Sequence, residues 1–82
     1  MEEEVGEITH YFPKISVAVV ALKAPLALGD RIAIRGVTTN LQQTVASMQI
    51  EHENVTKAKA GQSIGLKVEQ RVREKDRVFK IV

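Results

Sequence analysis

The sequence contains no cysteine, which excludes disulfide bridges, thiolate zinc sites and thiol chemistry. It also lacks any run close to the ~20 apolar residues that a membrane-spanning helix requires. Its first residues are Met1-Glu2-Glu3-Glu4, unlike the basic and apolar start of a secretory leader. We therefore expect a cytoplasmic protein with no membrane contact. A length of 82 residues suits one domain, and we expect residues 1–4 to be a flexible acidic tail on a domain spanning residues 5–82.

Motifs that carry catalysis are missing as well. No glycine-rich loop ends in Gly-Lys-Ser or Gly-Lys-Thr, so nothing would hold the phosphates of a nucleotide cofactor. His10 and His52 lie far apart, and neither has a second histidine at metal-ligand spacing. No serine stands in a nucleophile-elbow context. We expect a chain that is no enzyme and uses no metal or other cofactor.

The residue types that are abundant favour strands. Val, Ile and Thr are frequent, and no window shows a clean helical stripe. Turn residues separate six segments that we expect to be strands: 5–12, 15–22, 31–35, 41–50, 64–69 and 78–82. Residues 41–48 also fit a short helix, and the connection 51–62 has room for one helical turn. The pattern predicts an all-β fold, a small closed or nearly closed antiparallel barrel of about six to seven strands.

The second predicted strand, residues 15–22, is apolar on both faces, whereas a free barrel needs only one dry face. Either Val17 and Val19, or Ala18, Val20 and Leu22, should therefore face outward. An exposed apolar stripe of this kind indicates a protein contact or self-association. The alternative is that residues 24–28 or 51–60 cover it.

Charge is distributed unevenly along the chain. Residues 57–82 hold eight Lys and Arg residues against three acids, whereas residues 1–12 hold acids and no Lys or Arg. This asymmetry favours an anionic partner such as RNA, although a solvated basic surface explains it equally well. Side chains that would hold RNA phosphates in a salt-sensitive manner form what we call the basic set: Lys14, His52, Lys57, Lys59, Lys67, Arg71, Arg73 and Arg77.

Several short motifs occur in a characteristic order. Residues 47–53 read Ser-Met-Gln-Ile-Glu-His-Glu, and residues 61–68 read Gly-Gln-Ser-Ile-Gly-Leu-Lys-Val. Leu28-Gly29-Asp30 and Val37-Thr38-Thr39 precede them. Together these motifs resemble domain 2 of the translational GTPases, the barrel that follows the GTP-binding domain in elongation factors Tu and 1-alpha and in initiation factor 2. The resemblance covers nearly the whole chain.

The resemblance implies a non-catalytic binding module without a GTPase domain, an RNA- or ribosome-associated accessory protein. The family positions that hold the terminal adenosine of aminoacyl-tRNA fall on Gln49, Glu51 and His52. A second hypothesis is a protein-interaction barrel that docks on a larger enzyme through residues 15–22, similar to the barrel at the C-terminus of collagenase-like peptidases. The first hypothesis predicts binding that weakens with salt, and the second predicts salt-insensitive binding or dimerisation.

Overall fold

The computed structural model describes residues 2–82, and this part of the chain is all-β. Its strands are β1 (Glu2–Phe12), β2 (Val17–Leu22), β3 (Leu26–Ala27), β4 (Arg31–Arg35), β5 (Asn40–Thr44), β6 (Met48–Ile50), β7 (Glu53–Val55), β8 (Lys57–Ala58), β9 (Ser63–Lys67) and β10 (Arg77–Ile81). Within residues 2–82 no helix has the length and hydropathy of a membrane span.

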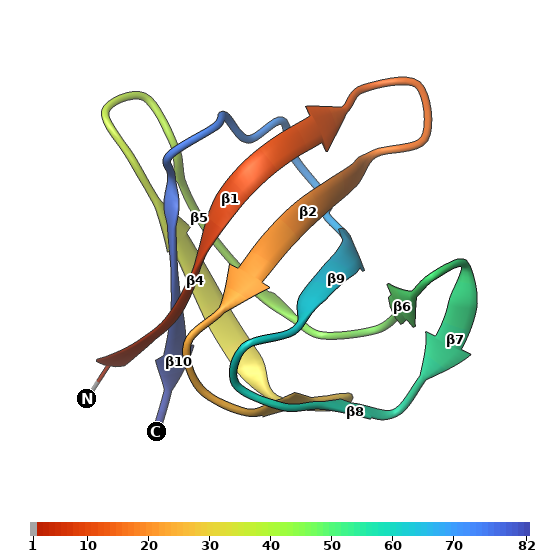
Figure 1. Cartoon of the computed structure of the whole chain (residues 1–82). Coiled ribbons are helices and arrows are strands. Elements are labelled where there is room, and N and C mark those ends of the chain that lie inside the picture. Colours follow the sequence, from red (N-terminus) through yellow and green to blue (C-terminus); the bar gives the residue numbers. More distant parts are fainter. Residues whose placement is uncertain (1) are drawn as a thin grey trace.

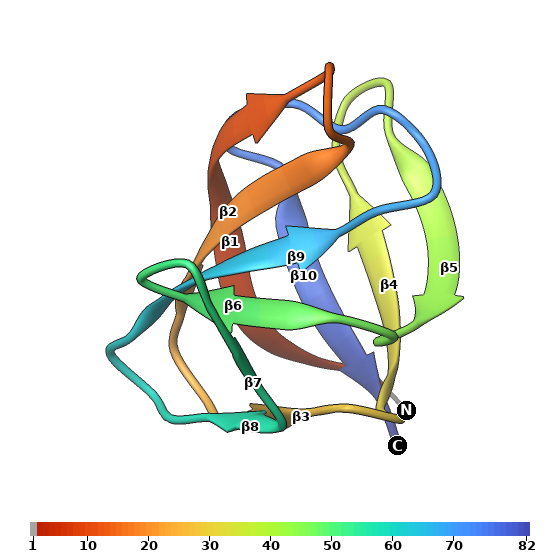
Figure 2. The same cartoon turned by 90° about the vertical axis from the view of Figure 1, so that its right-hand side faces the viewer.

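Eight of these strands form one antiparallel sheet that curls around the core (Figure 1). Its order is β5-β4-β10-β1-β2-β9-β6-β7, and β3 and β8 pair separately as a second antiparallel sheet. Figure 2 shows β9, β6 and β7 on one side, with the β3–β8 pair below them. The prediction of an all-β, antiparallel fold is confirmed. A closed barrel is not shown, because β5 and β7, the two edge strands of the sheet, do not pair with each other. The described strands number ten rather than six or seven.

The bend of the sheet begins in β1. Its register shifts between Glu4 and Gly6 against β10, and again between Ile8 and His10 against β2. Such bulges add an unpaired residue and increase the local twist of a strand. At Gly6 the backbones approach closely, since a Cβ there would lie 2.8 Å from the Ala21 carbonyl oxygen. The long β1 can therefore pair with β10 at one end and with β2 along most of its length.

The core fills the inside of the curled sheet with aliphatic side chains that alternate along each strand. In β2 the inward residues are Ala18, Val20 and Leu22, all buried, so the outward residues are Val17 and Val19. This decides between the two orientations that the sequence left open. The largest wholly buried side chains are Ile8, Leu26, Ile32, Ile34, Met48, Ile64 and Leu66.

Two segments differ from the prediction. The strand expected over 41–50 is interrupted, because the Val45 amide donates to the Asp30 carbonyl at 2.8 Å and the Val45 carbonyl accepts from the Gly29 amide at 2.9 Å. These bonds end β5. The chain then crosses to β6, and Ala46 in the crossing is exposed. Residues 51–62 contain β7 and β8 instead of a helical turn.

The expected flexible tail is also not found in the described residues. Glu2, Glu3 and Glu4 belong to β1 and pair with residues 79–81 of β10. Their ladder is reinforced by ion pairs, from Arg35 to Glu2 and from Lys23 and Arg77 to Glu4. Met1 lies outside the described residues.

Candidate functional site

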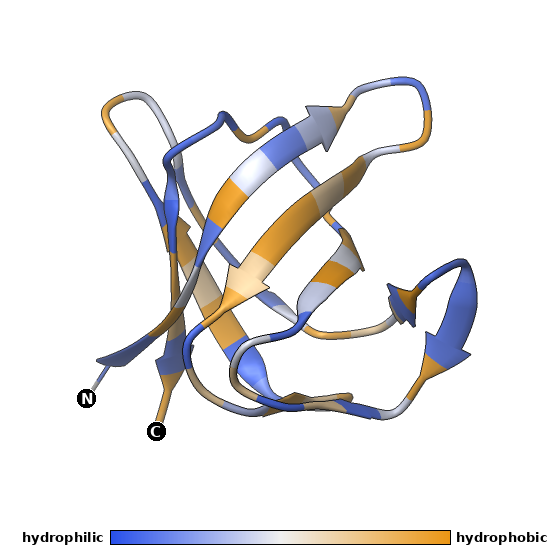
Figure 3. Cartoon of the chain, viewed as in Figure 1, coloured by the Kyte–Doolittle hydropathy of each residue, from blue (hydrophilic) through white to orange (hydrophobic). Residues whose placement is uncertain are grey.

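The outer face of β2 carries an apolar depression. Val17 and Val19 lie half-buried on it, and next to them Phe12 and Ile15 are 48% and 57% exposed. Figure 3 shows that the hydrophobic colour runs along β2. We call this depression of about 260 Å³ the β2 groove; its lining is Phe12, Ile15, Val17, Val19, Gln49, Glu51, His52, Ser63, Ile64 and Gly65.

A glycine forms part of the floor of the β2 groove. Gly65 in β9 pairs with Val19 on one side and with Gln49 on the other. A Cβ at Gly65 would lie 3.4 Å from Val17 Cγ1, so a larger side chain would fill the space between β2 and β6. A glycine within a strand often marks a place where another group comes close to the backbone, and at Gly65 the missing side chain leaves the groove open.

The turn between β6 and β7 forms the polar rim. Ile50 pairs with Glu53, and the two residues between them, Glu51 and His52, have φ values of 50° and 66°. A two-residue hairpin with both central φ values positive matches a type I′ turn, which prefers Asn-Gly. For L-residues this left-handed region costs roughly 1–2 kcal/mol each. The turn is therefore strained, and both of its central residues line the β2 groove.

Two predicted sites thus coincide. Gln49, Glu51 and His52, singled out through the translation-factor resemblance, line the same groove as Val17 and Val19 of the apolar strand. Ala18, Val20 and Leu22, the other members of the predicted protein contact, are buried in the core and cannot touch a partner. The sequence analysis did not name Ile15 as a contact residue. Its place as the first residue of the apolar run 15–22 could have indicated that it lies beside Val17 and Val19.

The basic set does not gather on one surface. Lys57 and Lys59 lie on and just after β8, in a pocket below the sheet. Arg71 and Arg73 lie in the segment between β9 and β10, which is not a strand, and line one depression together with Tyr11 and Pro13.

The remaining members of the basic set are dispersed or already engaged. Lys14 is exposed in the turn between β1 and β2, and the Lys67 ammonium donates to the Ile15 carbonyl at 2.9 Å. Arg77 donates to the Glu4 carboxylate at 3.0 Å. His52 lies at the β2 groove. The described members of the basic set are thus divided among several parts of the fold, and their binding to RNA stays a prediction.

Ion pairs to basic side chains lower the pKa values of two acidic residues near the start of the chain. The hydrogen bond from Lys23, followed by that from Arg77, lowers the pKa of Glu4 below its ordinary value. In the same way the Arg35 guanidinium lowers the pKa of Glu2. These carboxylates are charged at neutral pH and form ion pairs with basic residues around the first residues of β1.

Titratable side chains form no cluster with evident chemistry in the described region. No group of three or more His, Asp or Glu among residues 2–82 is placed to hold a metal ion. His10 approaches Glu74 at 3.6 Å between two exposed side chains. His52 lies elsewhere, at the rim of the β2 groove.

Comparison with known proteins gives relatives of one kind. The chain is 43% identical over 77 residues to a protein named as an uncharacterized protease of Methanocaldococcus jannaschii, covering 93% of this chain and 19% of that protein. It is 35% identical over 78 residues to a collagenase of Porphyromonas gingivalis, covering 93% of this chain and 22% of that protein. The chain thus spans about a fifth of the length of these relatives. No family model matches the sequence.

Solved structures give the same fold. The crystal structure of the C-terminal domain of a putative U32 peptidase from Geobacillus thermoleovorans superposes with a TM-score of 0.90 at 20% identity, covering 98% of this chain and 93% of that domain. Its selenomethionine variant superposes with a TM-score of 0.88, also at 20% identity, covering 93% of this chain and 96% of that domain. The chain therefore shares the fold of that C-terminal domain.

The prediction that the chain is related to domain 2 of the translational GTPases is wrong. The matched relatives are a protease and collagenases, and the matched fold is a U32 peptidase domain. The hypothesis of a ribosome-associated module is accordingly not supported, and the alternative of a barrel-like domain attached to a collagenase-like peptidase agrees better with these findings. The chain is similar, over nearly its whole length, to about a fifth of each of these peptidases.

Proposed function

We propose that the chain is a non-catalytic interaction domain of a U32-type, collagenase-like peptidase, and that the β2 groove is where it docks on the rest of that enzyme. The observation that carries the proposal is the exposed apolar surface of Phe12, Ile15, Val17 and Val19 on the outer face of β2. The relatives supply the partner, since about four fifths of their length lies outside the matched region.

The energetics suit docking within one protein. Burying a large apolar side chain contributes about 1.5–3 kcal/mol relative to leaving it exposed. A handful of such side chains is too little to offset the loss of translational and rotational freedom when two separate molecules associate. When the domain is joined to its partner, a high effective concentration replaces most of that cost. The small β2 groove therefore favours a covalently attached partner over a free one.

The polar rim gives the contact its orientation. Gln49 donates from its side-chain amide to Asn54 Oδ1 at 3.1 Å, which holds it along the hairpin. Glu51 and His52 are exposed on the strained turn, where they would pair with polar groups around an apolar segment of the catalytic part. An apolar centre with a polar rim is the usual anatomy of a protein interface.

We infer further that the domain behaves as a nearly closed barrel. The Gln43 side chain of β5 reaches across the open side of the sheet to Lys67 at the end of β9 and to Glu69 just after it. A closed rim would protect the backbone groups of the edge strand β5 from pairing with other chains.

The docking proposal is tested by joining this chain to the M. jannaschii relative in place of its matched 77 residues. Docked domains unfold together, so calorimetry of the joined protein should show one transition. Val19→Glu should split that transition into two, because it places a charge in the groove. Val37→Glu, the same change at a fully exposed turn residue, should leave one transition. Two transitions in the unsubstituted protein would contradict the proposal.

A further inference from the structure

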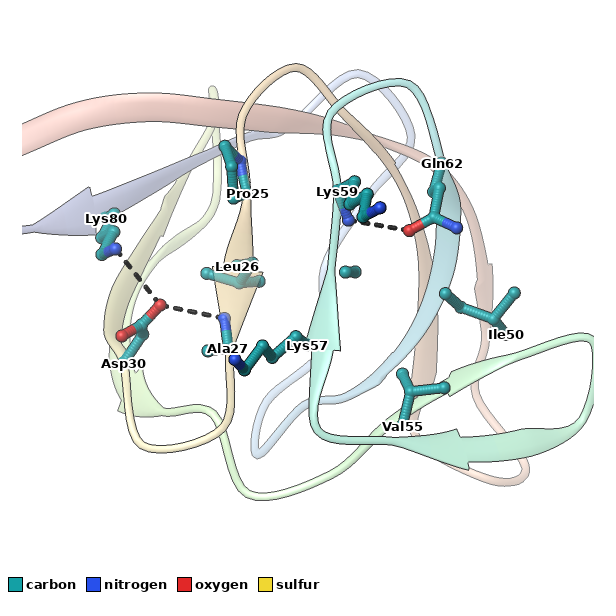
Figure 4. Close-up of a pocket in the computed structure, with 11 residues that line it drawn as sticks. Pro25, Leu26, Ala27, Asp30, Ile50, Val55, Lys57, Lys59, Gln62 and Lys80 are labelled. Carbon is teal, nitrogen blue, oxygen red and sulfur yellow. Dashed lines mark hydrogen bonds and ion pairs between the residues drawn. The ribbon is translucent and has the colours of Figure 1, made fainter.

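A second depression lies against the β3–β8 pair and shares no residue with the β2 groove. Its volume is about 450 Å³, within the range of small-ligand sites. Figure 4 shows Leu26, Ile50 and Val55 around it, with lysines at its rim. Ile50 and Val55 are half-buried, so they give it an apolar floor. We call it the lysine pocket.

Three ammonium groups surround the lysine pocket, and only one is neutralised. Lys80 lies 3.4 Å from the Asp30 carboxylate, which also accepts a hydrogen bond from the Ala27 amide at 3.0 Å. Lys57 and Lys59 form no ion pair within residues 2–82. The rim therefore carries two uncompensated positive charges above an apolar floor.

One more donor faces the same space. The Gln62 side-chain oxygen accepts from the Lys59 amide at 2.7 Å, which fixes the orientation of its side chain at the pocket wall (Figure 4). Its Nε2 group has no partner in the described part of the chain. A bound carboxylate could therefore accept from both an ammonium and an amide.

The lining chemistry points to one class of ligand. Single-stranded nucleic acids bind where bases stack on aromatic rings, and no aromatic side chain lines the lysine pocket. An acidic peptide fits better, because an aliphatic side chain would rest on Ile50 and Val55 while neighbouring carboxylates meet Lys57 and Lys59. We propose that the lysine pocket binds a peptide segment in which an apolar residue is flanked by acidic ones.

The probe is an end-blocked, fluorescein-labelled octapeptide in which leucine and aspartate alternate, titrated with the 82-residue chain and followed by anisotropy. Replacing its aspartates by asparagine, or its leucines by serine, should weaken binding by about tenfold or more, since each removes one half of the recognition. A labelled oligouridylate of equal charge should bind more weakly than the peptide.

Variants locate the site. Lys59→Glu should weaken peptide binding at least about tenfold. Arg71→Glu, an equal charge change between β9 and β10, should leave it within about twofold of the unsubstituted chain. Amide shifts at Ala27, Lys57 and Ala58 in the unsubstituted chain give a second readout that does not depend on a variant folding. Absence of binding, equal binding of the asparagine peptide, tighter binding of the oligouridylate, or shifts confined to other residues would each overturn the proposal.

Discussion

The side chain of Gln43 donates its amide to the backbone carbonyl of Lys67 at 2.8 Å. Its oxygen accepts from the Glu69 amide at 2.9 Å. Gln43 is buried in β5. Lys67 is the last residue of β9, and Glu69 lies two residues further along the chain. One glutamine therefore makes two backbone hydrogen bonds across the side on which the sheet does not close.

Replacing Gln43 should destabilise the fold. Gln43→Leu removes the side-chain partner of the Lys67 carbonyl and of the Glu69 amide, which are part-buried. Each lost partner should cost about 1 kcal/mol, the low end of the range for an unsatisfied buried group. We expect the free energy of unfolding, measured by urea titration, to fall by about 2 kcal/mol or more. Gln42→Leu, the exposed neighbour on the same strand, is the matched control and should change it little. Equal effects of the two substitutions would refute the bridging role.

Stability should depend on the acidic residues of β1. The pKa of Glu4 is lowered by Lys23 and Arg77, and that of Glu2 by Arg35. A carboxylate whose folded-state pKa is depressed stabilises the fold above its unfolded-state pKa, and that contribution is lost as the pH falls through the folded-state value. Stability should therefore decline from about pH 5 downward.

The measurement is thermal unfolding of the chain and of Glu4→Gln across this pH range. Glu4→Gln should be less stable than the unsubstituted chain at neutral pH, and the difference should shrink as the pH falls. Because these groups are exposed, added salt should reduce the effect. A difference that is independent of pH would show that the ion pairs contribute nothing.

Two strand glycines should respond differently to a methyl group. A Cβ at Gly6 would lie 2.7 Å from Val20 Cγ1 and 2.8 Å from the Ala21 carbonyl oxygen, so the β1–β2 pairing must shift. At Gly65 the nearest atom would be 3.4 Å away. Gly6→Ala should lower the melting temperature markedly, by overpacking worth about 1–3 kcal/mol, and Gly65→Ala should be tolerated. The reverse order would show that the close approach at Gly6 is not limiting.

The strained hairpin between β6 and β7 offers a stabilising change. Replacing Glu51 by Asn and His52 by Gly supplies the residues that a type I′ turn prefers. The double variant should raise the free energy of unfolding by about 0.5–1 kcal/mol, because glycine adopts positive φ at no steric cost. The same change should weaken docking in the joined protein, since both residues line the β2 groove. Unchanged docking would remove the turn from the proposed interface.

Much of the fold follows from local pattern. The alternation in residues 64–68 and the valines, isoleucines and threonines elsewhere indicate antiparallel strands, which the structure confirms. The interruption after Thr44 could not be foreseen, because it depends on hydrogen bonds that Val45 donates to Asp30 and accepts from Gly29, far away in the sequence. The paired state of Glu2–Glu4 likewise depends on distant residues of β10.

The candidate site was only partly predictable. The apolar run 15–22 indicated that one face would be exposed, yet the choice of Val17 and Val19 required the register of β2 against β1 and β9. The motifs that suggested a translation factor are turn glycines and strand residues, which serve an all-β fold irrespective of its function. Fold and function are separable in this way, and the relatives that the chain matches are a protease and a collagenase rather than translation factors.

The burial of the β2 groove in a complete protein is the most direct test of the docking proposal. The chain contains no cysteine, so Ile15→Cys introduces a single thiol at the groove and Val37→Cys a single thiol at a distant turn. Alkylation rates, resolved by peptide mass spectrometry, are compared between the isolated 82-residue chain and the joined protein. We predict that joining slows alkylation at position 15 by about tenfold or more and leaves position 37 unchanged. Equal rates at position 15 in the two proteins would contradict the docking proposal.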